Sequence, residues 1–305
     1  MTTPAVVTVG TFDGVHRGHL AVLEEVARRA RAAGREAVLV TFEPHPLDVI
    51  RPEAAPPLLT LADERRDLFA LAPVDRVVFL PFTPALRELA PERFVRDVLE
   101  RDVGMAELVI GHDHGFGRGR TGDVDLLRQI GERDGFGVDI VPSVLLEDGR
   151  SISSTLIRAA VAAADLDTAW RALGRPYGMR GRVVRGAGRG RTLGVPTLNV
   201  EPPPPRKLLP ADGVYAVSVL AGGARYGAMA NLGPRPTFGE RARGLEAHLF
   251  GVSGDWYGQS VGVEFVSRLR DTVRFASAEE LVAQIGRDRE AAVEALRKYG
   301  RPVTL

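Results

Sequence analysis

The first half of the chain alternates short apolar runs with stretches of helical periodicity. Each apolar run is long enough for one buried strand of a parallel sheet. The alternation predicts a doubly wound α/β domain, in which ligands bind at the carboxyl ends of the strands. The expected strands are residues 5–9, 37–42, 76–80, 108–110 and 138–141. The expected helices lie at 62–71, at 91–101 and after His19, where Leu20, Leu23, Ala27 and Ala30 recur at helical spacing.

The pattern changes near Gly174, which Pro176 follows, a combination that ends helices. Ser153 is the expected N-cap of one helix that runs to Gly174. Beyond it, the β-rich runs 213–220, 225–230 and 262–266 follow one another without a helix between them, which is typical of an antiparallel barrel. A capping box at 277–280 opens a closing helix that buries Leu281, Ile285, Ala292 and Leu296. We therefore predict two domains, 1–174 and 175–305.

Composition excludes several classes of protein. The chain has 305 residues, no cysteine and a net charge of +1, so disulfides, thiolate metal sites and a global attraction to nucleic acid or membranes are not expected. Neither a signal peptide nor an apolar run of membrane-spanning length is present, which favours a cytoplasmic protein. The sequence does not define an oligomeric state.

The first candidate site is the segment 10–19, which reads Gly-Thr-Phe-Asp-Gly-Val-His-Arg-Gly-His. It joins a strand to a helix. A glycine-containing turn lets backbone N–H groups approach an anion, and the helix N-terminus adds partial positive charge. His16 and His19 are three residues apart and can face one ligand. The segment predicts a phosphate site; the alternative is a tight turn in which the histidines only cap the helix.

Further polar residues follow other strands of the predicted sheet. They are residues 42–46 and residues 111–113 with Asp113. A fourth cluster, the segment 152–158, lies at the expected start of a helix and contains Ser153, Ser154, Thr155 and Arg158. Hydroxyl groups at a helix start together with an arginine can hold phosphate oxygens, although ordinary capping gives the same pattern. Because the carboxyl ends of parallel strands share one edge, we expect the three clusters at strand ends, residues 10–19, 42–46 and 111–113, to converge on one cleft.

The second domain carries a second candidate phosphate site at residues 185–194, which contain four glycines and three arginines. Gly186, Gly188 and Gly190 permit close approach of a polyphosphate, and Arg189 helps to neutralise it. A flexible basic loop is the alternative. Thr197 and Asn199 follow and project to the same side of an extended segment. Their neutral oxygens suit Mg²⁺, which is usually shared with waters and substrate phosphates.

These motifs together carry a resemblance. His-x-Gly-His at 16–19 and the segment 152–158 are similar to the two signatures of nucleotidyltransferases. Residues 194–200, 231–238 and 245–249 resemble three signatures of riboflavin kinases, in the same order. Over nearly its full length, the chain resembles the bifunctional riboflavin kinase/FMN adenylyltransferase family.

The resemblance implies a role for each site residue. Gly10, Phe12 and Asp13 belong to the adenylyltransferase's ATP site, where His16 and His19 stabilise the phosphates and Ser153, Ser154, Thr155 and Arg158 hold the outgoing pyrophosphate. Asp113 is expected near the flavin phosphate or a metal. Glu246 is implied as the general base that takes the proton of the terminal ribityl hydroxyl. Riboflavin, FMN, FAD and ATP are the implied partners, with Mg²⁺ in both reactions.

The chain departs from the family pattern at a few positions. Thr11 stands where asparagine is usual, and Phe250-Gly251 replaces Asp-Phe after the strand of Glu246. His114 and Gly115 replace an aromatic and a basic residue, which leaves the strength of FMN binding open. Two other functions are weighed against this one: a nucleotidyltransferase for another acceptor, such as a pantetheine or nicotinamide mononucleotide, and a flavin-binding regulator without activity.

Overall fold

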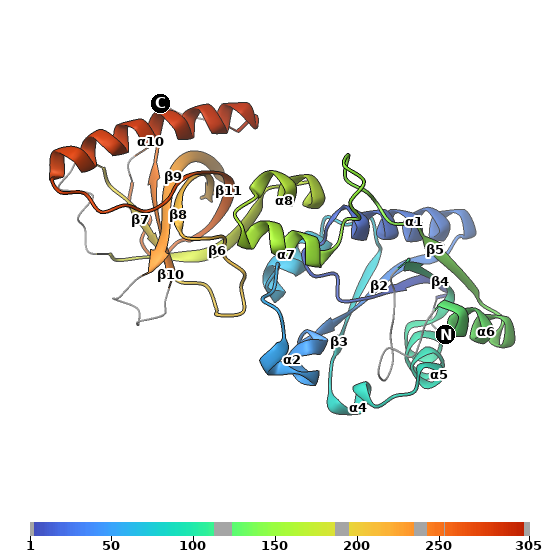
Figure 1. The fold of residues 1–305 in the computed structure, drawn as a ribbon. Coiled ribbons are helices and arrows are strands. Elements are labelled where there is room, and N and C mark those ends of the chain that lie inside the picture. The colour runs from blue at the N-terminus through green and yellow to red at the C-terminus, as the bar shows by residue number, and fades with distance from the viewer. Residues whose placement is uncertain (1–2, 113–123, 187–194, 235–242, 253, 302–305) are drawn as a thin grey trace. The chain divides into compact units, whose positions relative to one another are not determined.

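The computed structural model describes residues 3–112, 124–186, 195–234, 243–252 and 254–301. The chain forms two compact units, residues 1–154 and 155–305. The first is an α/β sheet domain and the second contains a closed β-barrel, as the sequence predicts (Figure 1). Residues 155–174 belong to the second unit, whereas the sequence analysis assigned them to the first domain. The assignment of one activity to each side of Gly174 stays a prediction.

A five-stranded parallel sheet forms the centre of the first unit, in the order β3-β2-β1-β4-β5. All five predicted strands are present. They are β1 (Ala5–Val9), β2 (Glu36–Glu43), β3 (Arg76–Pro81), β4 (Met105–Gly111) and β5 (Gly137–Val141). The strand order reverses between β1 and β4. Open α/β sheets bind their ligands at such a reversal, outside the carboxyl ends of the strands.

Helices cover both faces of this sheet, because its strands are apolar on both sides. Alternate β1 side chains belong to different cores: Val7 packs with Leu99 and Leu127 on one face, and Val6 packs with Val22 and Val26 on the other. The helices of this unit are α1 (Arg17–Ala33), α2 (Pro46–Ile50), η1 (Pro52–Ala54), α3 (Ala62–Phe69), α4 (Pro84–Arg87), α5 (Pro91–Arg93), η2 (Phe94–Val103) and α6 (Val124–Asp134). The predicted helix 91–101 is α5 continued by the π-helical η2.

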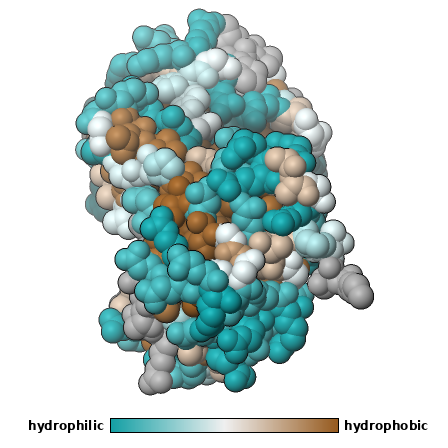
Figure 2. Space-filling model, turned by 90° about the vertical axis from the view of Figure 1, so that its right-hand side faces the viewer, coloured by the Kyte–Doolittle hydropathy of each residue, from teal (hydrophilic) through white to brown (hydrophobic). Residues whose placement is uncertain are grey.

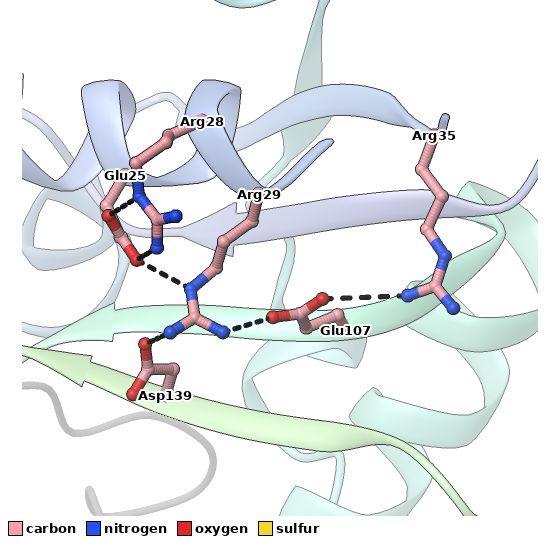
Figure 3. Close-up of polar contacts among 6 residues, drawn as sticks. All are labelled: Glu25, Arg28, Arg29, Arg35, Glu107 and Asp139. Atoms are coloured by element: carbon pink, nitrogen blue, oxygen red, sulfur yellow. Dashed lines mark hydrogen bonds and ion pairs between the residues drawn. The ribbon is translucent and has the colours of Figure 1, made fainter. Parts of the chain in front are cut away.

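A cluster of charged side chains joins α1 to the sheet (Figure 3). Arg29 of α1 donates to Glu25 on its own helix at 2.6 Å, to Glu107 of β4 at 2.7 Å and to Asp139 of β5. Hydrogen bonds from Arg28 and Arg29 lower the pKa of Glu25 to about 2. Since the carboxylate is more acidic in the folded state, its stabilising contribution is present above pH 4.5 and is lost as the pH falls toward 2.

The barrel of the second unit has the strand order β10-β7-β6-β11-β8-β9, and its strand pairs are antiparallel. Three strands lie where the sequence predicts them, and β6, β7 and β10 complete the barrel. The strands are β6 (Tyr177–Val184), β7 (Leu198–Val200), β8 (Gly213–Ala221), β9 (Ala224–Pro234), β10 (Arg243–Leu249) and β11 (Ser260–Arg270). On β10, Leu245 and Ala247 are buried, and Glu246 and His248 alternate with them on the opposite face.

The helical stretch before Gly174 differs from the prediction. It is divided into α7 (Ser154–Ala162) and α8 (Leu166–Leu173) rather than one helix. Ala164 has a φ of 56°, which interrupts the helical backbone, and Asp165 caps α8 by accepting from the N–H of Thr168. Gly174 ends α8 in the left-handed conformation, as expected.

The closing helix, α10 (Ala278–Lys298), covers part of the barrel's outer surface. Ser277 accepts from the N–H of Glu280, while the Glu280 carboxylate reaches the N–H of Ala276 rather than that of Ser277. Ala292 and Leu296 are buried, and Leu281 and Ile285 are half-buried.

Most of the surface shown in Figure 2 is hydrophilic. No helix in the described part of the chain is long and apolar enough to cross a membrane.

Arg29→Ala should destabilise the first unit by about 1–2 kcal/mol, because it leaves the half-buried Glu107 without one of its cations. Arg28→Ala is the matched control: Arg28 shares Glu25 but is 61 % exposed, so its loss should cost less than about 0.5 kcal/mol. Urea unfolding of both variants measures the difference, and equal effects would contradict a stabilising role of the Arg29 cluster.

Candidate active sites

The turn after β1 is held by a buried carboxylate. Asp13 is 1 % exposed and accepts hydrogen bonds from the N–H groups of Leu59 and Thr60, at 3.1 and 2.9 Å, and from the Thr60 hydroxyl at 3.1 Å. The same hydroxyl oxygen accepts from the N–H of Gly14 at 3.0 Å. Charge-assisted bonds of this kind compensate the desolvation of the carboxylate. Asp13 thus determines the shape of the turn.

The backbone of this turn is strained. Phe12 and Val15 have φ values of 49° and 40°, in the left-handed region that a β-branched residue such as Val15 rarely enters. Both side chains are buried and pack with Leu23, Leu39 and Phe69. Packing therefore maintains a conformation that costs free energy, and strain of this kind concentrates at functional sites.

The two histidines of the turn lie against one another. His16 is the N-cap of α1, and its Nδ1 accepts from the N–H of His19 at 3.2 Å, while Nδ1 of His19 accepts from the N–H of His16 at 3.4 Å. The rings stack with centroids 3.5 Å apart. An accepting Nδ1 carries no proton, so each neutral ring has its N–H at Nε2. The capping of α1 by these histidines, which the sequence analysis gave as the alternative, is therefore present.

Arg65 supports the same edge of the sheet, and the sequence analysis did not identify it. The side chain is 4 % exposed and donates to the carbonyl oxygens of Thr11, at 3.0 Å, and Phe42, at 2.9 Å. Burial lowers the pKa of its guanidinium, which Asp13 and Glu43 partly offset. Arg65 lies among other charged residues in the helix sequence, so only the fold distinguishes it.

The segment before α7 meets the turn after β1. Ser154 donates from its hydroxyl to the carbonyl oxygen of Asp13 at 2.9 Å, although the two residues are 141 positions apart. A Cβ at Gly18 would lie 3.7 Å from the carbonyl oxygen of Ile152. This hydrogen bond brings the start of α7 into contact with the turn that carries the two histidines.

The remaining predicted residues of this site stay predictions. Ser153 immediately precedes α7. Thr155 and Arg158 lie on α7 within the second compact unit. Asp113, His114 and Gly115 lie outside the described residues.

In the barrel, strand pairing aligns polar residues in one row. Glu246 of β10 lies opposite Asn199 of β7 on one side and opposite Asn231 of β9 on the other. Directly opposed residues of an antiparallel pair project from the same face, with Cβ atoms about 5 Å apart. A carboxylate between two amides can bind hydroxyl groups and share a hard cation with a phosphate.

Two residues near this row, Gly186 and His248, are in close contact with neighbouring segments. A Cβ at Gly186 would lie 2.2 Å from the side-chain nitrogen of Asn199, so only glycine fits over the amide without displacing it. The Nδ1 of His248 lies 2.8 Å from the carbonyl oxygen of Pro196, next to Thr197. Gly188, Arg189 and Gly190 lie outside the described residues.

The geometry defines an α/β sheet domain with a strained, histidine-bearing turn at the reversal of its strand order, followed by a barrel with its own polar row. Residues 1–156 match the family model described as FAD synthetase, and residues 173–296 match the model described as riboflavin kinase. The chain belongs to the bifunctional riboflavin kinase/FMN adenylyltransferase family and is an ATP-using enzyme of flavin nucleotide synthesis.

Relatives with this family name match over nearly the whole chain. The protein of Pseudomonas fluorescens is 43% identical over 94% of this chain and 91% of its own length. That of Escherichia coli K12 is 39% identical over 95% of this chain and 92% of its own. A crystal structure of a protein from Streptococcus pneumoniae, described as a macrolide-efflux protein, is 32% identical with a TM-score of 0.87 and covers 96% of this chain and 95% of that one.

Gly186→Ala should reduce riboflavin kinase activity about tenfold or more, because the added methyl group displaces the Asn199 amide from the row, and small displacements at a reacting centre are costly. Adenylylation of added FMN should persist. Gly286→Ala is the control, since nothing lies within 4 Å of its Cβ position. Rates of FMN formation test the contrast; an unaltered rate in Gly186→Ala would show that Asn199 tolerates the displacement.

Proposed function

We propose that the two reactions have separate sites with the residues named above. Riboflavin is phosphorylated by ATP to FMN at the row of Asn199 and Glu246, and FMN is adenylylated by a second ATP to FAD, with release of pyrophosphate, at His16 and His19. The observation that carries this division is that the histidine pair and Glu246 belong to different compact units.

In the kinase step, Glu246 accepts the proton of the terminal ribityl hydroxyl as its oxygen attacks the γ-phosphorus of ATP, and ADP leaves. A carboxylate suffices because phosphoryl transfer depends on positioning and on charge stabilisation more than on a strong base. The register supports this role, since it places Glu246 beside Asn199 at the predicted nucleotide site.

In the adenylyl step, the phosphate oxygen of FMN attacks the α-phosphorus of ATP and pyrophosphate leaves. Nε2–H of His16 and of His19 donate to phosphate oxygens as negative charge increases there. Gly10 and Phe12 shape the turn, and Asp13 acts from beneath it through Leu59 and Thr60 rather than by contact with a phosphate, which its own charge would repel. Ser153, Ser154, Thr155 and Arg158 hold the pyrophosphate, and Asp113 lies near the flavin phosphate or a metal.

Mg²⁺ is the cofactor proposed for both steps. The donors at the barrel site fit it: Thr197 and Asn199 supply neutral oxygens, and the buried Asn199 makes no side-chain hydrogen bond within the described residues. Bound there with the nucleotide, the ion would neutralise phosphate charge. Gly186, Gly188, Arg189 and Gly190 would contact the same phosphates. A cytoplasmic location also stays a proposal.

Two variants should separate the activities. His19→Ala should reduce FAD formation from FMN by roughly 100-fold or more while leaving FMN formation within about twofold, because it removes one donor to the transition state. Glu246→Ala should abolish FMN formation while added FMN is still converted to FAD. Chromatography of the products measures both, and loss of both activities in either folded variant would contradict separate sites.

Removal of divalent metal with EDTA should stop both reactions, and added Mg²⁺ should restore them. Asn199→Ala should raise the Mg²⁺ concentration needed for half-maximal FMN formation about tenfold, without changing the requirement of FAD formation. An equal shift for both reactions would argue against a metal ligand at Asn199.

A further inference from the structure

Asn231 is a polar residue of the barrel to which the proposed reactions assign no role. It lies in β9, directly opposite Glu246 of β10, and its next neighbour in the row is Val214 of β8. Its side chain therefore projects from the face that carries Glu246 and Asn199. The motif 231–238 contributes to the family resemblance, but neither the resemblance nor the proposed reactions give this amide a task.

The side-chain oxygen of Asn231 is buried and accepts no hydrogen bond within the described part of the chain. Buried polar atoms are nearly always paired, because an unpaired one loses its bonds to water without replacement. An apolar residue would serve a purely structural strand position better, as Val214 does beside it. Local rules broken in this way are expected where a residue serves a ligand.

The kind of atom restricts the ligand. An amide oxygen accepts only, so its partner must carry a hydrogen: a hydroxyl or N–H group qualifies, and an ionised phosphate oxygen does not. The adjacent carboxylate of Glu246 also disfavours an anion at this place. A polyhydroxylated chain fits both neighbours, since it presents hydroxyl groups on successive carbons and each can donate to one side chain.

We propose that Asn231 is a specificity-determining residue of the riboflavin kinase reaction, whose amide binds a secondary hydroxyl of the ribityl chain while Glu246 binds the terminal one. This inference rests on the proposed role of Glu246. The amide oxygen accepts from the secondary hydroxyl, and the amide N–H group can donate to the next oxygen along the chain. Asn231 would thus select a polyol substituent over an apolar chain of equal length.

The test combines Asn231→Leu with a riboflavin analogue that has an ω-hydroxypentyl chain, which keeps the terminal hydroxyl and lacks the secondary ones. In Asn231→Leu, kcat/KM for FMN formation from riboflavin should fall roughly tenfold or more. The analogue's inhibition constant against the same reaction should change less than about twofold, because it has no hydroxyl for the amide to bind. Asn231→Ser, which keeps a hydrogen-bonding group, should recover part of the loss.

Stability supplies an independent readout. Replacing an unpaired buried acceptor by an apolar group should leave the melting temperature of Asn231→Leu equal or raised, and FMN adenylylation should be unchanged. An unaltered kcat/KM for riboflavin would overturn the proposal. So would a weakening of the analogue's inhibition constant by the same factor as the loss in kcat/KM, or a lowered melting temperature that accounts for the loss of activity. An incorrect assignment of Glu246 as the general base is detected by a separate variant. Full kinase activity in Glu246→Gln would contradict the proposed function, independently of the results for Asn231.

Discussion

The pairing of β10 with its two neighbours is the constraint on which the proposed kinase site depends. Asn199, Glu246 and Asn231 come from three strands, and backbone hydrogen bonds bring them into one row. A shift of the register by one residue would turn Glu246 into the barrel and expose Leu245, because side chains alternate along a strand. Burial of Leu245 and Ala247 therefore maintains the alignment of the polar groups. The apolar core and the polar row are on the two sides of the same strand.

In the sheet domain, a hydrogen-bonded carboxylate and side-chain packing, rather than strand register, position the polar residues. Here one buried carboxylate, that of Asp13, joins the turn after β1 to Leu59 and Thr60, and the packing of Phe12 and Val15 maintains a backbone that is unfavourable by itself. The turn is followed at once by the stacked histidines at the start of α1. Strain, burial and capping thus act together to fix the backbone of the turn and the position of the two histidines, at which we propose a phosphate site.

The helices between Ser154 and Gly174 show that tertiary packing can divide a segment whose apolar periodicity predicts one helix. Apolar periodicity is continuous up to Gly174, and the sequence therefore favours one helix. Ala164 interrupts it, and α8 instead stacks Trp170 against Tyr299 of the C-terminal segment, with ring centroids 4.5 Å apart. Two short helices can each turn an apolar face toward a different neighbour, which one straight helix cannot do.

Local patterns in the sequence were sufficient for the strands of the sheet domain, the N-cap of α10 at Ser277, the end of α8 at Gly174 and the family, because buried strands, caps and motif spacings depend on near neighbours. The second half of the predicted capping box was wrong, since Glu280 bonds to Ala276. Only the tertiary structure decided that Asp13 bonds to Leu59 and Thr60, that Arg65 supports Thr11 and Phe42, and that Asn231 stands beside Glu246. Each of these contacts joins residues far apart in the chain. The pairing of Asn231 with Glu246 follows from strand register, and the other contacts follow from how loops and α3 pack at the end of the sheet, which no local pattern contains.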